Sequence, residues 1–236
     1  MIVFDHVSKP PGIVDVSLRI KPTEKVAIIG RSGSGKTTLL RLICRWLRPT
    51  SGTITAPPRS EFAYIPQDLD ASLNPRMTVQ DIVLESVVIA KGNLAAAKRE
   101  LPAMLDSLGL PKDCAGRNPG ELSGGQRQRV GIARALMPNP RVIYADEALS
   151  ALDSVARKLV IDLFTRTDLT VLLVTHDLHT AEKFAHRFVM LDAGRVVEDL
   201  PIEQLWDPTG AIEVRQQFIA AERVLHPNLP RFGEQA

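Results

Sequence analysis

The stretch Gly-Arg-Ser-Gly-Ser-Gly-Lys-Thr at residues 30–37 decides the fold. It matches the pattern G-x-x-x-x-G-K-[ST], whose glycines let the backbone curve around a polyphosphate with its N–H groups pointing inward. An apolar run at residues 26–29 predicts a buried strand before this loop, and residues 36–47 predict a helix that opens from it. A phosphate-binding loop needs this order, because the helix N-terminus adds a favourable dipole. The plainer alternative is a glycine-rich turn that ends in Lys-Thr by chance, which the flanking strand and helix disfavour.

Two side chains of the loop have distinct expected roles. Lys36 supplies positive charge to the terminal phosphates of a nucleotide, and the Thr37 hydroxyl can ligate Mg²⁺. A loop of this kind indicates nucleotide binding and leaves open which machine uses the nucleotide. The residues expected to bind the phosphates are Gly30, Arg31, Ser32, Gly33, Ser34, Gly35, Lys36, Thr37 and Thr38.

Strand and helix patterns around the loop predict an α/β fold with a mainly parallel sheet. Residues 1–25 alternate apolar and polar side chains and predict two antiparallel N-terminal strands, and residues 192–195 predict a hairpin turn. Strands that alternate with helices are typical of parallel sheets. Short apolar runs predict further buried strands at residues 62–65, 142–145, 171–175 and 188–191.

The middle of the chain has a different pattern. Residues 79–137 carry little strand signal, and their helical patterns are broken at Gly92, Pro102, Pro111 and Gly120. We interpret this stretch as a helical subdomain inserted into the α/β core of a single domain. The catalytic α/β core is then formed by residues 1–78 and 138–200, and residues 201–236 form a C-terminal tail with a helix at 211–225.

The composition excludes several classes of protein. Among the 236 residues, 44% are apolar and 24% are charged, which is ordinary for a globular protein. The longest apolar runs are far shorter than the roughly 18 residues that span a bilayer, so we expect no membrane crossing. A net charge of +2 gives little reason to expect a nucleic-acid partner. Cys44 and Cys114 lack zinc-site spacing, and no secretory leader is visible, so we expect a cytoplasmic protein.

An acidic pair follows the apolar run at residues 142–145. Asp146 at this strand end can hold the Mg²⁺ shell, and Glu147 beside it is well placed to orient a water molecule and take its proton. The alternative is a strand followed by an ordinary acidic helix N-terminus, where carboxylates are favoured by the helix dipole.

A second glycine-bearing loop, Leu-Ser-Gly-Gly-Gln, occupies residues 122–126 and precedes a helical run at 127–137. The hydroxyl of Ser123 and the helix N-terminus form another anion cradle. The alternative is a plain helix cap with glycine spacers. Since only one of the two cradles carries a Lys-Thr pair, the second can close on a nucleotide held by a different copy of the domain.

Together these motifs resemble the ATP-binding cassette (ABC) ATPases, the motor subunits of ABC transporters. The resemblance covers about residues 1–200 and has six motifs in the family's order. Three of them are the phosphate loop, the Leu-Ser-Gly-Gly-Gln loop and the acidic strand end described above. The other three are a Q-loop glutamine at Gln67, a D-loop at residues 150–153 and a switch histidine, His176. The resemblance implies a RecA-like P-loop NTPase core that binds and hydrolyses ATP with Mg²⁺.

The resemblance also implies a role for each matching residue. Gln67 contacts Mg²⁺ and the attacking water, Glu147 acts as general base, and His176 senses the γ-phosphate. Asp153 crosses a dimer interface. The nucleotide of the opposite protomer is contacted by Ser123, Gly125 and Gln126. Each role has a plainer alternative: a surface loop residue for Gln67, a helix N-terminal acid for Asp153 and a structural histidine for His176.

The chain departs from the family in its first turn. Residues 8–12 lack the aromatic side chain that usually stacks on adenine, so Phe4, His6 or a proline face would have to replace it. The stretch Ser-Leu-Asn-Pro-Arg at residues 72–76 resembles the peptide and nickel importers and the phosphonate-cluster ATPases. The peptide and nickel importers often have a longer C-terminal region with clustered cysteines, and residues 201–236 do not contain such a cluster.

The family's mechanism implies several partners. Two such domains, identical or similar, close head to tail over two Mg·ATP molecules, and hydrolysis reopens them. Transmembrane permease subunits receive the motion at the cytoplasmic face of the cell membrane, and a solute-binding protein delivers cargo. We weigh two alternatives: a soluble ABC ATPase of DNA repair or translation, and a regulatory cassette that binds nucleotide without turnover.

Overall fold

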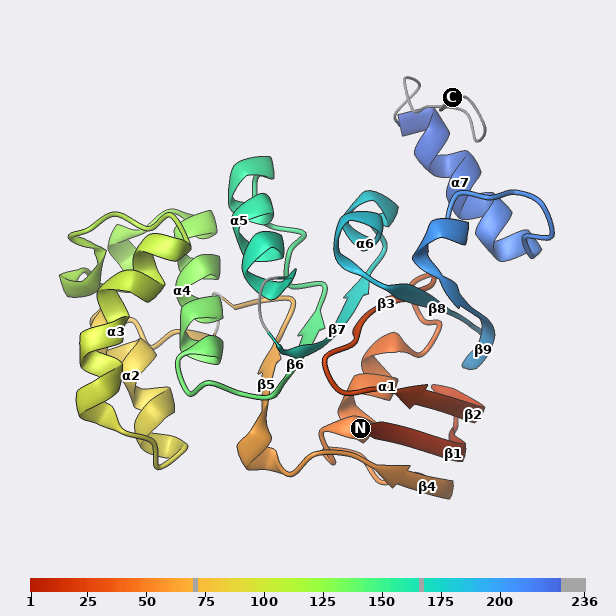
Figure 1. Ribbon diagram of the computed structural model, residues 1–236, viewed down its shortest axis with the longest axis horizontal. Helices are drawn as coiled ribbons and strands as arrows, with labels where there is room; N and C mark the ends of the chain where they lie inside the picture. Colours follow the sequence, from red (N-terminus) through yellow and green to blue (C-terminus); the bar gives the residue numbers. More distant parts are fainter. Residues whose placement is uncertain (70–71, 166–167, 226–236) are drawn as a thin grey trace. The chain divides into compact units, whose positions relative to one another are not determined.

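The computed structural model describes residues 1–69, 72–165 and 168–225. These residues form two compact units, and Figure 1 labels their helices and strands. The first comprises Met1–Ala56 together with the chain from Val174 onward, and the second comprises Pro57–Leu173. Among the described residues, no helix combines the length and the apolar character that a bilayer span requires.

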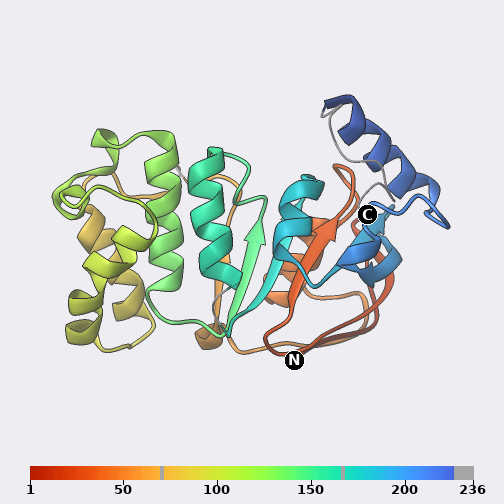
Figure 2. The same cartoon turned by 45° about the horizontal axis from the view of Figure 1, so that its top comes forward.

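The first unit contains most strands and the N- and C-terminal helices. The C-terminal helix α7 (Glu213–Leu225) lies next to the hairpin of β8 and β9 (Figure 2). The side chain of Arg215 on this helix forms a 2.9 Å ion pair with Glu198 on β9. In chain order, its elements are β1 (Ile2–Lys9), β2 (Ile13–Ile20), β3 (Lys25–Ile29), α1 (Lys36–Ile43), β4 (Ser51–Thr55), α6 (Leu178–Phe184), β8 (Arg187–Asp192), β9 (Arg195–Pro201), a short 3-10 turn at Ile202–Gln204 and α7 (Glu213–Leu225).

Strands β1, β2 and β4 form an antiparallel sheet in the order β2-β1-β4. The alternation in the sequence sets its two faces, because Val16, Leu18 and Ile20 are buried while the residues between them are exposed. Elsewhere in the unit, β3 pairs in parallel with β8, and β8 pairs antiparallel with β9. The predicted antiparallel N-terminal strands and the predicted hairpin turn are both confirmed.

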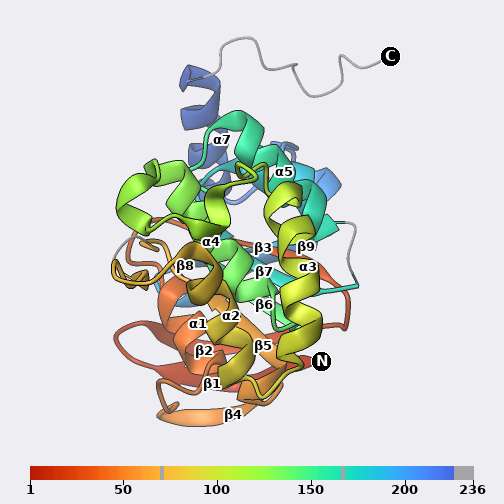
Figure 3. The same ribbon diagram turned by 90° about the vertical axis from the view of Figure 1, so that its left-hand side faces the viewer.

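The second unit contains the helical stretch. Helices α2, α3 and α4 lie side by side (Figure 3), and β5 pairs in parallel with β6. Strand β7 (Thr170–Thr175) runs across the boundary of the two units. The other elements are β5 (Phe62–Ile65), α2 (Val79–Ile89), α3 (Leu94–Ser107), α4 (Gly124–Leu136), β6 (Val142–Asp146), α5 (Ser154–Thr165) and 3-10 turns at Arg59–Glu61, Cys114–Gly116 and Pro119–Glu121.

The mixed α/β fold is confirmed, but several predicted boundaries are wrong. Helix α1 ends at Ile43 rather than at residue 47, because Arg45 adopts a left-handed φ of 60° and the N–H of Trp46 bonds back to the Arg41 carbonyl at 2.9 Å. This is a Schellman ending with arginine in place of the usual glycine. Strand β4 was not predicted, since its residues are mostly exposed.

Pro102 does not break its helix, contrary to the prediction. The buried positions Ala97, Leu101 and Leu105 follow a four-residue spacing that continues across it, so packing on this face holds α3 together. Helix α4 starts at Gly124 rather than at residue 127, and α7 starts at Glu213 rather than at residue 211. Residues 226–236 of the predicted tail lie outside the described residues.

Candidate functional site

The phosphate loop joins β3 to α1 in the first unit, as the sequence predicts. The ammonium group of Lys36 donates to the carbonyl oxygens of Gly30 at 2.7 Å and Arg31 at 2.8 Å, and the residue is only 7% exposed. The loop is closed by a 3.1 Å bond from the N–H of Ser34 to the Arg31 carbonyl. A buried cation therefore sits inside a glycine-rich turn at a helix N-terminus, which is an arrangement suited to anions.

Gly35 is required at the start of α1. It has a φ of 106°, and a Cβ atom there would lie 2.2 Å from the carbonyl oxygen of Gly12. Gly12 in turn packs against Thr38, where an added Cβ would lie 2.4 Å from the threonine Oγ1. The turn between β1 and β2 therefore packs directly against the first turn of α1.

A buried hydroxyl in the loop fits a phosphate ligand. Among the described residues, the Oγ atom of Ser34 is buried and has no hydrogen-bond partner within the protein. A buried polar atom of this kind is costly unless a ligand or water satisfies it. Gly35, the N-cap of α1, provides no side-chain cap, so the first N–H groups of the helix are also suited to a phosphate.

The second unit contains the acidic strand end. Asp146 is the last residue of β6 and is only 6% exposed. The hydroxyl of Tyr64, on the neighbouring strand β5, donates to its Oδ2 atom at 3.0 Å. This contact orients the carboxylate, and its oxygen atoms are the ligand type that Mg²⁺ prefers. The sequence does not indicate Tyr64 as a partner of Asp146, because the pairing of β5 with β6 becomes visible only in the structure.

Glu147 follows in a turn with unusual backbone geometry. Its φ is 49°, a left-handed value that is uncommon for a residue other than glycine. The Gln67 side-chain amide donates to its Oε2 atom at 3.2 Å. The structure therefore brings together two of the residues assigned to catalysis, the Q-loop glutamine and the proposed general base.

Ser123 is the N-cap of α4. Its Oγ accepts the N–H of Gln126 at 3.3 Å, and the Gln126 side chain accepts the N–H of Ser123 at 2.9 Å. This reciprocal pair is a capping box. Gly125 has nothing within 4 Å of a Cβ added to it, so the helix start is open to a ligand.

The other two predicted site residues lie beside helix starts. Asp153 precedes α5, and its Oδ1 accepts the N–H of Ala156 at 2.8 Å. His176 follows β7 and is exposed, and the next residue, Asp177, caps α6 by accepting the N–H of Thr180 at 3.0 Å. Like the phosphate loop, His176 belongs to the first unit, whereas Gln67 and the residues between 123 and 153 belong to the second.

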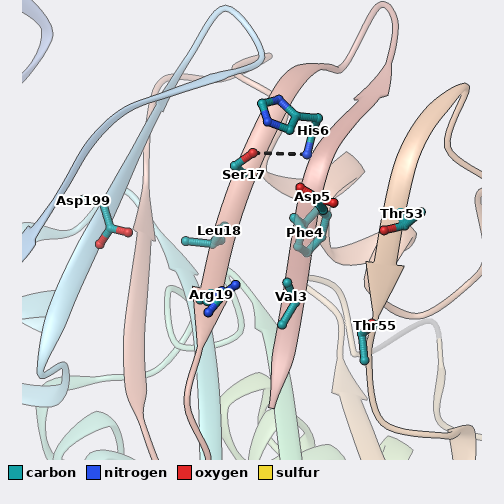
Figure 4. A pocket seen from close by; sticks show the side chains of 10 residues that line it. All are labelled: Val3, Phe4, Asp5, His6, Ser17, Leu18, Arg19, Thr53, Thr55 and Asp199. Carbon is teal, nitrogen blue, oxygen red and sulfur yellow. Dashed lines mark hydrogen bonds between the residues drawn. The ribbon is translucent and has the colours of Figure 1, made fainter.

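A separate groove of about 660 Å³ lies over the N-terminal sheet (Figure 4). His6 lines it and donates its backbone N–H to Ser17 Oγ at 3.1 Å (Figure 4). The ring of His6 contacts Asp15 at 2.8 Å, and this hydrogen bond raises the pKa of His6. Phe4 is only 2% exposed, so the idea that it stacks on a base is wrong for this structure. Phe4 and His6, the two residues considered for stacking on adenine, line this groove, whereas among the described residues none of the phosphate loop or of the other motifs lines it.

The loop, its buried lysine and the acidic strand end define a P-loop nucleotide-binding domain. Residues 13–150 match the family model described as ABC transporter. The chain therefore belongs to the ABC transporter family, which confirms the resemblance drawn from the motifs.

Several relatives and solved structures are similar to the chain. A probable peptide ABC transporter ATP-binding protein from Sinorhizobium fredii is 36% identical over 82% of the chain and 60% of its own length. A putative peptide import ATP-binding protein from Brucella ovis is 39% identical over 81% of the chain and 67% of its own length. A dimeric ATP-binding cassette, solved with ADP and Pi after hydrolysis, is 31% identical, with a TM-score of 0.75 over 86% of the chain and 99% of the cassette. The chain spans less than two thirds of the length of the first relative.

Proposed function

We propose that this chain is the ATP-binding and ATP-hydrolysing subunit of an ABC transporter. In this proposal it drives import of a peptide, nickel or a related small solute, and the names of the relatives favour a peptide. The observation that carries the proposal is the phosphate loop with its buried Lys36 and orphaned Ser34 hydroxyl, in a chain that keeps the family's other motifs in order. The relatives' names favour transport over a role in DNA repair or translation.

The first unit would bind the phosphates of ATP. Backbone N–H groups at the start of α1 would donate to phosphate oxygens, and Lys36 would exchange its two carbonyl partners for the terminal phosphates. The Ser34 hydroxyl would gain the partner that it lacks in the protein. His176, at the end of β7, would sense the γ-phosphate.

The second unit would supply the acid–base chemistry. Glu147 would take a proton from the attacking water, and Gln67, which already donates to it, would hold that water and the base in register. Oxygen atoms of Thr37, Asp146 and Gln67 suit Mg²⁺ and would hold it. When bound, Mg²⁺ neutralises charge on the β- and γ-phosphates.

The cradle at the start of α4 would act on a second protomer. Ser123, Gly125 and Gln126 would contact the γ-phosphate bound by a partner ATPase, and Asp153 would lie at the same interface. ATP would then hold two protomers together and hydrolysis would release them. Permease subunits, with a solute-binding protein, would couple this motion to import at the cytoplasmic face of the cell membrane.

Replacing the base tests the chemistry. We expect Glu147→Gln to bind Mg·ATP with parental affinity while its turnover falls by about 10²–10⁴-fold, the usual contribution of a general base. Phosphate release and equilibrium nucleotide titration measure the two quantities separately. Lys36→Ala should instead lose tight binding. Near-parental turnover in Glu147→Gln would remove that residue from its role.

Affinity purification tests the transport part. The tagged Glu147→Gln protein would be purified gently from its own cells with Mg·ATP, and its partners identified by mass spectrometry. Recovery of polytopic membrane proteins and a solute-binding protein supports the proposal. Recovery of ribosomal or DNA-maintenance proteins alone refutes transport and leaves the ATPase chemistry standing.

A further inference from the structure

Gln128, on the second turn of α4, makes a buried contact that the family's motifs do not account for. The residue is only 3% exposed, and its side-chain amide donates to the carbonyl oxygen of Ala148 at 2.6 Å. Ala148 directly follows Glu147 and is itself fully buried. This hydrogen bond anchors the segment around Ala148, because a buried carbonyl without a hydrogen-bond partner would be costly.

The segment that it anchors is under backbone strain. Glu147 has a φ of 49°, and a residue other than glycine keeps this strained conformation only where the surrounding structure fixes it. Ser150 holds the same turn from the other side, because its N–H and its hydroxyl reach the Glu147 carbonyl at 3.2 and 2.8 Å. The two successive carbonyls that follow the Cα of Glu147, its own and that of Ala148, therefore each accept a hydrogen bond from a fixed donor.

We propose that Gln128 is a positioning residue for the general base: its amide fixes the Ala148 carbonyl and so keeps Glu147 in the strained conformation that directs its carboxylate to Gln67. This inference rests on the proposed function, because it takes Glu147 as the base. Gln128 touches neither nucleotide nor water in this scheme and acts only through the turn.

The position of Gln128 gives the contact a second consequence. The same helix begins at the Ser123 cap, whose hydroxyl is proposed to meet the nucleotide of the partner protomer. Helix α4 is held further by Arg129, which donates to the carbonyls of Leu108 and Gly109 at 3.0 and 2.8 Å. Helix α4 therefore links Ser123, which is proposed to contact the partner's nucleotide, to the turn that contains Glu147, the proposed base of this protomer.

The test removes the donor while keeping the shape. In Gln128→Met the methionine side chain has nearly the same length and volume as that of glutamine, and it has no N–H group to donate. We expect kcat to fall about tenfold, equivalent to about 1.4 kcal/mol, while the Kd for Mg·ATP changes less than about twofold. Phosphate release gives kcat, and titration of a fluorescent ATP analogue gives Kd.

A double mutant separates positioning from a general loss of structure. In the Glu147→Gln background the base is already absent, so adding Gln128→Met should change the residual rate by less than about twofold. A variant that merely unfolds a fraction of the protein would lower both rates by the same factor. An equal tenfold loss in both backgrounds therefore overturns the proposal.

Control variants make each outcome decisive. Ile132→Val removes one buried methylene from the same helix and no hydrogen bond, so its turnover should stay parental. If Gln128→Met does not fold, Gln128→Leu also lacks a side-chain donor, places no charge in this buried position and should show the same loss of kcat. If both variants fail to fold while Ile132→Val folds, Gln128 is a core residue and the proposal is overturned. If Glu147→Gln is slow but Gln128→Met is parental, the proposed function stands and only this inference falls. If Glu147→Gln is itself parental, the assignment of the base is wrong and the inference falls with it.

Discussion

Replacing Gly35 by alanine should damage the phosphate loop far more than the same change at Gly33. Both glycines have positive φ values, 106° at Gly35 and 79° at Gly33. A Cβ atom on Gly35 would lie 2.2 Å from the Gly12 carbonyl oxygen, whereas nothing lies within 4 Å of a Cβ on Gly33. The two variants therefore share the conformational cost and differ in the steric one.

The expected loss of unfolding free energy follows from the conformational cost and the steric cost. A positive φ costs an alanine roughly 1–2 kcal/mol, which is all that Gly33→Ala should lose. In Gly35→Ala the new methyl group meets backbone rather than a flexible side chain, so the turn between β1 and β2 must move. We expect a total loss of about 3–5 kcal/mol for this variant, in the range of severe core changes. At about 2–4 °C per kcal/mol for a chain of this size, the two midpoints should differ by roughly 4–12 °C.

Thermal unfolding without nucleotide is the informative assay. ATP binding should weaken in both variants, because both glycines lie in the loop, so affinity alone does not distinguish them. The free energy of unfolding from urea titration would confirm the ranking. Equal midpoint temperatures of unfolding for Gly33→Ala and Gly35→Ala would refute the claim that the turn at Gly12 packs directly against α1.

Three further predictions concern stability and reactivity. Burial alone would raise the pKa of Glu24, but its 2.6 Å bond to Arg187 and the Lys21 N–H bring that pKa below its ordinary value. Glu24→Gln should therefore cost about 1–2 kcal/mol of unfolding free energy at pH 7, a value between those of exposed and buried ion pairs. A carboxyl group with a lowered pKa stabilises the fold only above its pKa in the unfolded chain, so this deficit, measured by urea titration, should shrink as the pH falls below 4.5. A deficit that stays constant with pH would contradict this. Burial raises the pKa of Cys114, so the native protein should leave this thiol unmodified by iodoacetamide at pH 8, with rapid alkylation in the mass spectrum as the contrary result. Ser123→Ala should lose about 1 kcal/mol by calorimetry through its missing helix cap, whereas Ser123→Asn, which can still cap, should not.

The sequence predicted those features whose causes are local. The phosphate loop needs glycine at positions such as Gly35, and a short spacing fixes both its lysine and the helix that follows. The alternation in β2 likewise depends on adjacent residues. In both cases the physical requirement and the residues that meet it lie within about ten positions of each other, so one segment carries the whole signal.

Features with distant causes could not be predicted. Helix α1 ends through a left-handed Arg45, where the usual glycine signal is absent. Helix α3 continues through Pro102 because neighbouring helices bury its apolar face. The contact of Tyr64 with Asp146 joins residues 82 positions apart, and that of Gln128 with the Ala148 carbonyl joins residues 20 apart. Residue type alone does not reveal such partners, which become visible only when the strands and helices are placed.

The cap at Ser123 shows that a structural role and a chemical role need not compete. A hydroxyl has two lone pairs and one proton, and the capping box uses a lone pair to accept the N–H of Gln126. The proton is not consumed by this bond and can be donated to a phosphate oxygen. The cap also fixes the rotamer, so the proton is presented from a defined position at the N-terminus of a helix, where an anion is favoured. The plain helix cap, weighed in the sequence as the alternative to an anion cradle, is therefore the arrangement that would prepare the cradle for its ligand.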